Sequence, residues 1–283
     1  MGLHLSPNTN LIINIAYLGT SFNGWQSQKS GNTVQDILIK SAQQILNCPV
    51  HVLGASRTDS GVHAWHQVAK VSFSKEFCPR QFKIAVNSVL PKSIRIYHSE
   101  NCGESFHPVR QSTGKLYHYR IWKDHRCLNP FYMDKCWPVG GDLNYQELRE
   151  LKKSFIGSMN FKSMCASDSS AKTFEREIFD ISIFNEEKYL DMWFLGSGFL
   201  KQMIRNIVGT LIDGLRKNSS LEDLQAIIAG KDRRLGGRTA PAAGLSLARV
   251  FYDDFNKSLI NLIEENNNNF HYGILLNTPK EIF

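Results

Sequence analysis

Residues 51–74 read HVLGASRTDSGVHAWHQVAKVSFS, and they indicate two strands joined by a tight turn. Residues 51–54 and 62–74 carry the β-branched and apolar side chains that favour strands. The segment between them, ASRTDSG, is small and polar, which is typical of a turn. This stretch therefore predicts a strand pair in a sheet.

The turn presents charged side chains between two glycines. Gly54 and Gly61 flank it, and glycine permits backbone angles that place a side chain at the apex of a loop. Asp59 next to Arg57 is a candidate nucleophile or base that neighbouring positive charge keeps ionised. The pattern alone leaves open a second interpretation, an Arg57–Asp59 ion pair that only decorates a hairpin.

Outward from the turn, the first half of the chain alternates strands and helices. A polar loop with Gly24 carries two aromatic residues, Phe22 and Trp25, that we expect to be exposed. The predicted elements are a strand over 11–18, a helix opened by a capping box at Thr33, a helix near 79–89 and a strand near 93–99.

The second half repeats this alternation. The most regular helical pattern is 197–215, where apolar residues form one wide stripe. The other predicted elements are the strand LYHYRIW (116–122), a helix over 143–157, strands over 177–184 and 188–195, and a helix from Ser220 to Gly230.

These patterns predict an α+β fold. We expect two similar halves, each an antiparallel or mixed sheet with helices on one face, and an active-site cleft between them. The predicted limits are residues 1–108 for the N-terminal domain and 109–255 for the C-terminal domain. Residues 256–283 have little periodicity and are predicted to form a peripheral tail.

Composition restricts the partners. Of the 283 residues, 33 are Lys or Arg and 26 are Asp or Glu, so the net charge is +7, which favours a polyanionic partner. No apolar run is long enough to span a bilayer, and the N-terminus lacks the layout of a signal peptide. Six scattered cysteines without a Cys-x-x-Cys pair favour a reducing cytoplasm, and the histidines do not cluster; we therefore expect no metal.

Five ordered motifs resemble one known family. GASRTDSGVHAWHQVAKVSF is similar to the signature of the TruA-type tRNA pseudouridine synthases. The other motifs are TSFNGWQSQ, GKLYHYRI, FLKQMIRNIVGTL and TAPAAGLSLARV, and together they cover roughly residues 11–252. The resemblance implies an enzyme that isomerises uridine to pseudouridine in tRNA, at positions 38 to 40 of the anticodon stem-loop. It also implies a homodimer in which one tRNA contacts both subunits.

The implied reaction agrees with the residues present. It breaks the C1′–N1 bond of uridine and rejoins the base through C5, so one carboxylate beside the ribose is required. Asp59 is implied as that group, either attacking C1′ or removing the C2′ proton. Uracil leaves as a resonance-stabilised anion, so the second acid of a glycoside hydrolase is not needed. The reaction involves no redox change and no group donor, so we expect no cofactor.

The resemblance also implies roles for four other residues. Arg205 is implied to be the positive partner of Asp59. The helical pattern alone, with Lys201 one turn earlier, indicates a solvated surface arginine instead. Tyr117 holds the uracil ring by stacking, and its hydroxyl takes part in the proton transfer at C5. Tyr119, which faces the same side of the strand, packs in the core. From the pattern alone, both tyrosines are core residues.

Two substrate-binding assignments complete the predicted site. Arg57 contacts an RNA phosphate or flips the target nucleotide. Leu245 forms an apolar wall of the pocket, and core packing remains the alternative. Two other functions also stay open for the chain as a whole, a non-catalytic RNA-binding protein and an N-glycoside hydrolase that releases the base.

Overall fold

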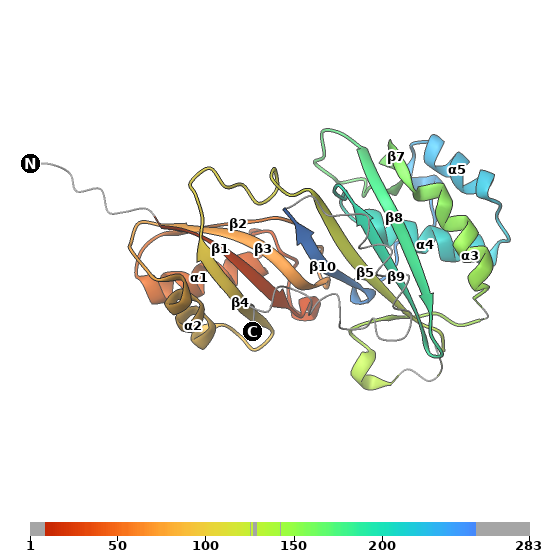
Figure 1. The fold of residues 1–283 in the computed structure, drawn as a ribbon. Helices are drawn as coiled ribbons and strands as arrows, with labels where there is room; N and C mark the ends of the chain where they lie inside the picture. The colour runs from red at the N-terminus through yellow and green to blue at the C-terminus, as the bar shows by residue number, and fades with distance from the viewer. Residues whose placement is uncertain (1–8, 125, 127–128, 142, 253–283) are drawn as a thin grey trace, which may run out of the picture. The chain divides into compact units, whose positions relative to one another are not determined.

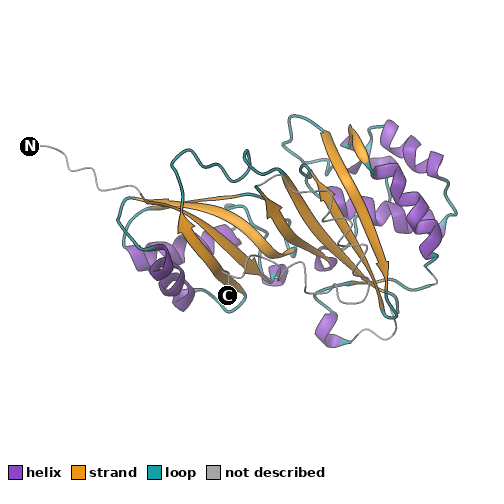
Figure 2. Cartoon of the chain, viewed as in Figure 1, coloured by secondary structure: helices purple, strands orange, loops and turns teal. Residues whose placement is uncertain are grey.

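The computed structural model describes residues 9–124, 126, 129–141 and 143–252. Helices and strands alternate along this chain, which confirms the α+β class (Figure 2). The backbone divides into two compact units. The described residues of the first are 9–112 with 247–252, and those of the second are 113–124, 126, 129–141 and 143–246. The predicted domain limits, the similarity of the halves and the cleft stay predictions, and the predicted tail, 256–283, lies outside the described residues.

The first unit is built on an antiparallel sheet. Strand β3 pairs with both β1 and β2, and β1 also pairs with β4 (Figure 1). Helix α1 packs against β2 and α2 packs against β4. The elements are β1 (Thr9–Tyr17), α1 (Val34–Leu46), β2 (Val50–Gly54), β3 (His63–Phe73), α2 (Pro79–Val89) and β4 (Ile94–Asn101).

Helix α1 begins where the sequence predicts it. The Thr33 side chain accepts a hydrogen bond from the Asp36 backbone N–H at 3.1 Å, which satisfies one of the donors left open at a helix N-terminus. Val34, Leu38 and Ala42 recur one turn apart and are at most 2% exposed. Their spacing places one apolar stripe of the helix in the core.

The second unit is a mixed sheet with three helices. Strand β9 pairs with β5 on one side and with β8 on the other, and β8 also pairs with β7; all three pairs are antiparallel. Strand β6 pairs with β5 in parallel. Helix α3 packs against α4 and α5. The elements are β5 (Gly114–Trp122), β6 (Trp137–Pro138), α3 (Tyr145–Leu151), β7 (Gly157–Asn160), β8 (Glu175–Asn185), β9 (Tyr189–Gly196), α4 (Met203–Arg216) and α5 (Leu221–Ala229).

Strand β10 (Leu245–Phe251) ends the described fold. Its first two residues belong to the second unit, and the rest belong to the first. Short 3₁₀ helices connect the other elements; they are Gly19–Ser21, Pro130–Tyr132, Lys152–Phe155, Lys162–Met164, Arg233–Leu235 and Ala242–Gly244. No helix in the described part of the chain is long and apolar enough to cross a membrane.

Two predicted helices are shorter than expected. The helix predicted over 143–157 ends at Leu151 and continues as a 3₁₀ helix, because Gly157 starts a strand instead. The helix predicted over 197–215 begins only at Met203, since Gln202 before it has a left-handed backbone with φ of 60°. Lys201 is therefore outside the helix, and its ammonium binds Asp168 at 2.7 Å.

The expectation that Phe22 and Trp25 are exposed is wrong. Their side chains are 5% and 1% exposed. Trp25 lies against Gly54, where an added Cβ would come within 2.4 Å of the indole ring. It also stacks on Tyr17, with the ring centroids 6.1 Å apart. The glycine thus supplies the space that buries the loop's largest side chain.

Candidate active site

The turn that carries Asp59 begins where the hydrogen-bonded ladder between β2 and β3 ends. The last ladder-like bond joins the Ala55 N–H to the Val68 carbonyl at 2.8 Å. Beyond it, the buried Gln67 side chain takes over the pairing: its amide N donates to the Ser56 carbonyl at 2.6 Å and its amide O accepts from the Ser56 N–H at 3.1 Å. The chain reverses where the Val62 N–H donates to the Asp59 carbonyl at 3.1 Å.

The loop from Tyr17 to Trp25 holds the turn from its other side. The Trp25 N–H donates to the Thr58 carbonyl at 3.1 Å, and the hydroxyls of Tyr17 and Thr58 are 2.8 Å apart. The Ser60 hydroxyl donates to the Phe22 carbonyl at 3.2 Å. Backbone and side-chain bonds therefore fix the residues on both sides of Asp59.

Replacing Gly24 with alanine is expected to destabilise this unit strongly. Gly24 has a φ of +82°, and an added Cβ would lie 2.6 Å from the Thr58 carbonyl oxygen. Gly31, in the same loop, has a φ of +66° with nothing within 4 Å of an added Cβ, so it is the matched control. Gly31→Ala should cost about 1–2 kcal/mol from backbone strain alone. Gly24→Ala should cost clearly more in urea unfolding, and equal costs would contradict the close contact.

The two charged residues of the turn differ in exposure. The Arg57 side chain is exposed, whereas Asp59 is half-buried. An exposed guanidinium at this position is available to a large ligand. A half-buried carboxylate is partly shielded from water yet still reachable.

Tyr117 lies in β5, opposite Phe194 of β9 in the register of the sheet. It is 5% exposed, and its ring meets the edge of Phe199 with centroids 5.2 Å apart. Tyr119 is fully buried, and its hydroxyl donates to the Pro241 carbonyl at 2.9 Å. Tyr119 is thus bound to backbone in the core, as predicted for the packing member of the pair.

Sequence reasoning did not single out Lys115 on the same strand. Lys115 and Tyr117 share one face of β5, because alternate residues of a strand point the same way. Lys115 is 8% exposed, and burial, together with the nearby charge of Arg176, lowers the pKa of its ammonium to about 8. The sequence signal that could have indicated Lys115 is the alternation of Lys115, Tyr117 and Tyr119 in GKLYHYRI.

Arg205 is in the first turn of α4 and is half-buried. Its Nε donates to the Ala240 carbonyl at 2.7 Å, and the Ala240 N–H donates back to the Arg205 carbonyl at 3.1 Å. The backbone and the side chain of Arg205 are therefore both bonded to Ala240. A half-buried guanidinium bonded to backbone differs from the alternative interpretation, a solvated surface arginine, and the role of Arg205 as the partner of Asp59 stays a prediction.

The segment that follows Ala240 joins Arg205 to the core of the second unit. Its Pro241 carbonyl binds Tyr119, and Gly244 lies against the same ring, where an added Cβ would be 2.7 Å from the tyrosine. Leu245 then begins β10 and is 5% exposed. The structure thus places Arg205, Tyr119 and residues 240–245 in one contiguous part of the unit.

A family comparison covers both units. The model of the family described as tRNA pseudouridine synthase matches residues 13–110 and 152–253. The chain belongs to the tRNA pseudouridine synthase family. The resemblance predicted from the five motifs is thereby confirmed. Members of the tRNA pseudouridine synthase family are isomerases that convert uridine to pseudouridine in tRNA.

Relatives match over nearly their whole length. The "tRNA pseudouridine synthase A 2" of Clostridium perfringens is 37% identical over 245 residues, which cover 86% of this chain and 99% of the relative. The "tRNA pseudouridine synthase A" of Lawsonia intracellularis is 35% identical over 250 residues, 84% of this chain and 97% of the relative. The "tRNA pseudouridine synthase A" of Acetivibrio thermocellus is 36% identical over 244 residues, which cover 86% of this chain and 99% of the relative.

The matched ranges of the tRNA pseudouridine synthase model contain four of the five predicted site residues. Arg57 and Asp59 lie in the first range, and Arg205 and Leu245 lie in the second. Tyr117 lies between the two ranges. Its assignment therefore rests on the GKLYHYRI motif and on its place in β5.

Proposed function

We propose that this chain isomerises uridines at positions 38 to 40 of the tRNA anticodon stem-loop, with Asp59 as the reacting carboxylate. The observation that carries the proposal is the turn at residues 55–62. Hydrogen bonds from Gln67, Trp25 and Tyr17 fix it, and it leaves Asp59 half-buried within a segment that matches the family. The relatives' name, tRNA pseudouridine synthase A, supports the substrate.

The proposed chemistry begins at the ribose. Asp59 attacks C1′ or removes the C2′ proton, and the C1′–N1 bond breaks with its electron pair going to uracil. The base turns and C5 forms the new bond to C1′. In the first route the Asp59–C1′ ester bond breaks in this step and releases the carboxylate; in the second, Asp59 returns the proton to C2′. The C5 proton is then lost and N1 gains a proton. No electron or group is transferred to another molecule, so we expect activity without a cofactor or metal.

The other residues act on charge and on the base. The guanidinium of Arg205 balances the charge of Asp59, which keeps the carboxylate ionised in a shielded site. The ring of Tyr117 stacks on the uracil, and Leu245 contributes an apolar wall. Arg57, exposed on the turn, binds a phosphate beside the flipped nucleotide.

The test is incubation of the purified chain with unmodified tRNA transcript labelled with tritium at uridine C5. Tritium release, with pseudouridine mapped to positions 38 to 40, is the expected result. Free uracil and an abasic site would instead identify an N-glycoside hydrolase. Tight tRNA binding without either product would identify a non-catalytic RNA-binding protein.

Binding of tRNA should weaken steeply as salt rises. The chain carries a net charge of +7, and each phosphate contact releases a counterion, so the logarithm of affinity should fall linearly with the logarithm of salt concentration. Filter binding between about 50 and 200 mM salt measures the slope. A flat line would show that the basic excess does not bind RNA.

We further propose a cytoplasmic homodimer that binds one tRNA across both subunits. Sedimentation equilibrium at micromolar concentration should give twice the chain mass of 32.2 kDa. A mass of one chain at that concentration, in protein that converts tRNA, would contradict the dimer and leave the reaction unaffected.

A further inference from the structure

Helix α4 is covered by a segment that we call the strap, residues 233–240 (RRLGGRTA). Its backbone touches the helix backbone directly. An added Cβ at Gly209 would lie 1.7 Å from the Arg238 carbonyl oxygen, and one at Gly237 would lie 2.7 Å from the Thr210 Cα. Two glycines, one on each segment, thus allow an approach that any side chain would prevent.

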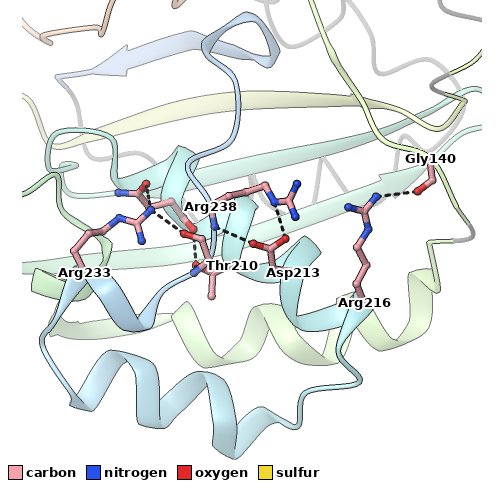
Figure 3. A network of polar contacts seen from close by, with 8 residues as sticks. Gly140, Thr210, Asp213, Arg216, Arg233 and Arg238 are labelled. Carbon is pink, nitrogen blue, oxygen red and sulfur yellow. Dashed lines mark hydrogen bonds and ion pairs between the residues drawn. The ribbon is translucent and has the colours of Figure 1, made fainter.

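Polar bonds fix the strap along the helix, as Figure 3 shows. The Gly237 N–H donates to the Thr210 hydroxyl at 2.9 Å. The Asp213 carboxylate accepts from the Arg238 N–H at 2.9 Å and from the Arg238 Nε at 2.8 Å. These contacts set the register of the strap against α4.

Asn206 is the buried centre of this network. It is fully buried, and its amide N donates to the Met164 carbonyl at 2.9 Å. Its amide O accepts from the Thr239 hydroxyl at 2.7 Å and from Nη2 of Arg233 at 2.9 Å. Arg233 also donates to the Gly237 carbonyl at 2.8 Å, so one guanidinium joins the start of the strap to its middle and to the helix.

The strap ends on Arg205. Its last residue, Ala240, accepts the hydrogen bond from Nε of Arg205 and returns one from its own N–H. Asn206 is the next residue of α4, so the centre of the network is adjacent to the arginine that the strap contacts. The position of the Ala240 carbonyl therefore depends on the bonds that Asn206 and Arg233 make.

We propose that Asn206 and Arg233 are positioning residues, which hold the strap so that the Ala240 carbonyl orients the guanidinium of Arg205 for the reaction. This inference rests on the function proposed above for Arg205. Small errors in the placement of a reacting group lower rates steeply, about 10²-fold for roughly 1 Å. Loss of the network should consequently lower the chemical rate and leave tRNA affinity nearly unchanged.

The test compares Arg233→Ala with Arg234→Ala. Arg234 is the matched control, because it is the next residue of the strap and its side chain is 90% exposed and paired with Asp232. Single-turnover rates with saturating enzyme, tRNA dissociation constants and thermal melts are measured for both. We expect Arg233→Ala to lower the rate by about 10- to 100-fold. Arg234→Ala should stay within about twofold of the wild-type rate, because it contributes nothing to the contact with Asn206.

A double variant separates positioning from general damage. If Arg233 acts through Arg205, adding Arg233→Ala to Arg205→Ala should cause little further loss of rate. Multiplied losses in the double variant, an unchanged rate in Arg233→Ala, or a loss confined to tRNA affinity would each overturn the inference. If Arg233→Ala does not fold, Thr239→Val is the second variant; it removes the hydroxyl that donates to Asn206 and accepts from Arg233. It should lower the rate in the same sense, and an unchanged rate would overturn the inference. Wild-type protein that makes no pseudouridine would overturn the proposed function itself.

Discussion

Asp59→Asn protein is expected to bind tRNA and to form no pseudouridine. The substitution keeps the size of the side chain but replaces a negative oxygen with an amide, which can neither attack C1′ nor accept the C2′ proton. The single-turnover rate should fall by at least about 10⁴-fold. Affinity for tRNA should persist or increase, because phosphate contacts elsewhere supply most of it and a negative charge is lost.

A thermal melt shows whether the Asp59→Asn protein is folded, so that a loss of activity can be assigned to the carboxylate. The backbone bonds of the turn, from Trp25 to Thr58 and from Val62 to Asp59, do not involve the Asp59 carboxylate, so the fold should be retained. If Asp59 only pins the turn through an ion pair, the asparagine variant should be less stable and still active. Substantial pseudouridine from a folded Asp59→Asn protein would disprove the catalytic assignment.

Arg205→Ala is expected to lower the single-turnover rate by about 10²- to 10³-fold, the range seen when one fixed charge-stabilising donor is removed from an active site. The variant loses the guanidinium proposed to balance Asp59, and it loses the bond to the Ala240 carbonyl. The lost hydrogen bond has a charged donor, so its loss should cost about 1.5–3 kcal/mol of unfolding free energy. The loss of rate is therefore measured on protein that a thermal melt shows to be folded.

Arg205→Lys is the informative companion variant. Lysine keeps the positive charge but lacks the planar guanidinium, so it cannot reproduce both the bond to Ala240 and the orientation of the charge. We expect an intermediate rate from tRNA single turnover. A rate equal to that of Arg205→Ala would show that orientation dominates, and a wild-type rate would show that neither charge geometry nor the Ala240 contact matters.

The local elements could be predicted where sequence pattern and local chemistry agree. The turn between β2 and β3 was predictable, because small polar residues and two glycines separate two apolar segments. The start of α1 at Thr33 was predictable for the same reason, since its cap involves residues three apart. In both places the structure depends on neighbours in the chain.

Features that depend on distant residues were missed. The burial of Trp25 depends on the space above Gly54, and no periodicity in the polar loop reports it. The late start of α4 has a local cause instead, the left-handed backbone of Gln202, which the apolar pattern through Phe199 and Leu200 does not reveal. Asn206 looks like an ordinary polar residue between apolar ones, and only the folded strap shows that it is a centre of hydrogen bonding.

The bonds that hold the Asp59 turn also determine when the site forms during folding. Tyr17 and Thr58 are 41 residues apart in the chain, and Gly19 and His63, whose N–H and Nδ1 are bonded, are 44 apart. A β2–β3 hairpin closes early because its contacts are local, but these longer loops close only when β1 docks beside β3. In a refolding experiment, the return of strand signal should therefore precede the return of catalytic competence, which requires the docking of β1 and also the second unit that carries Arg205 and Tyr117.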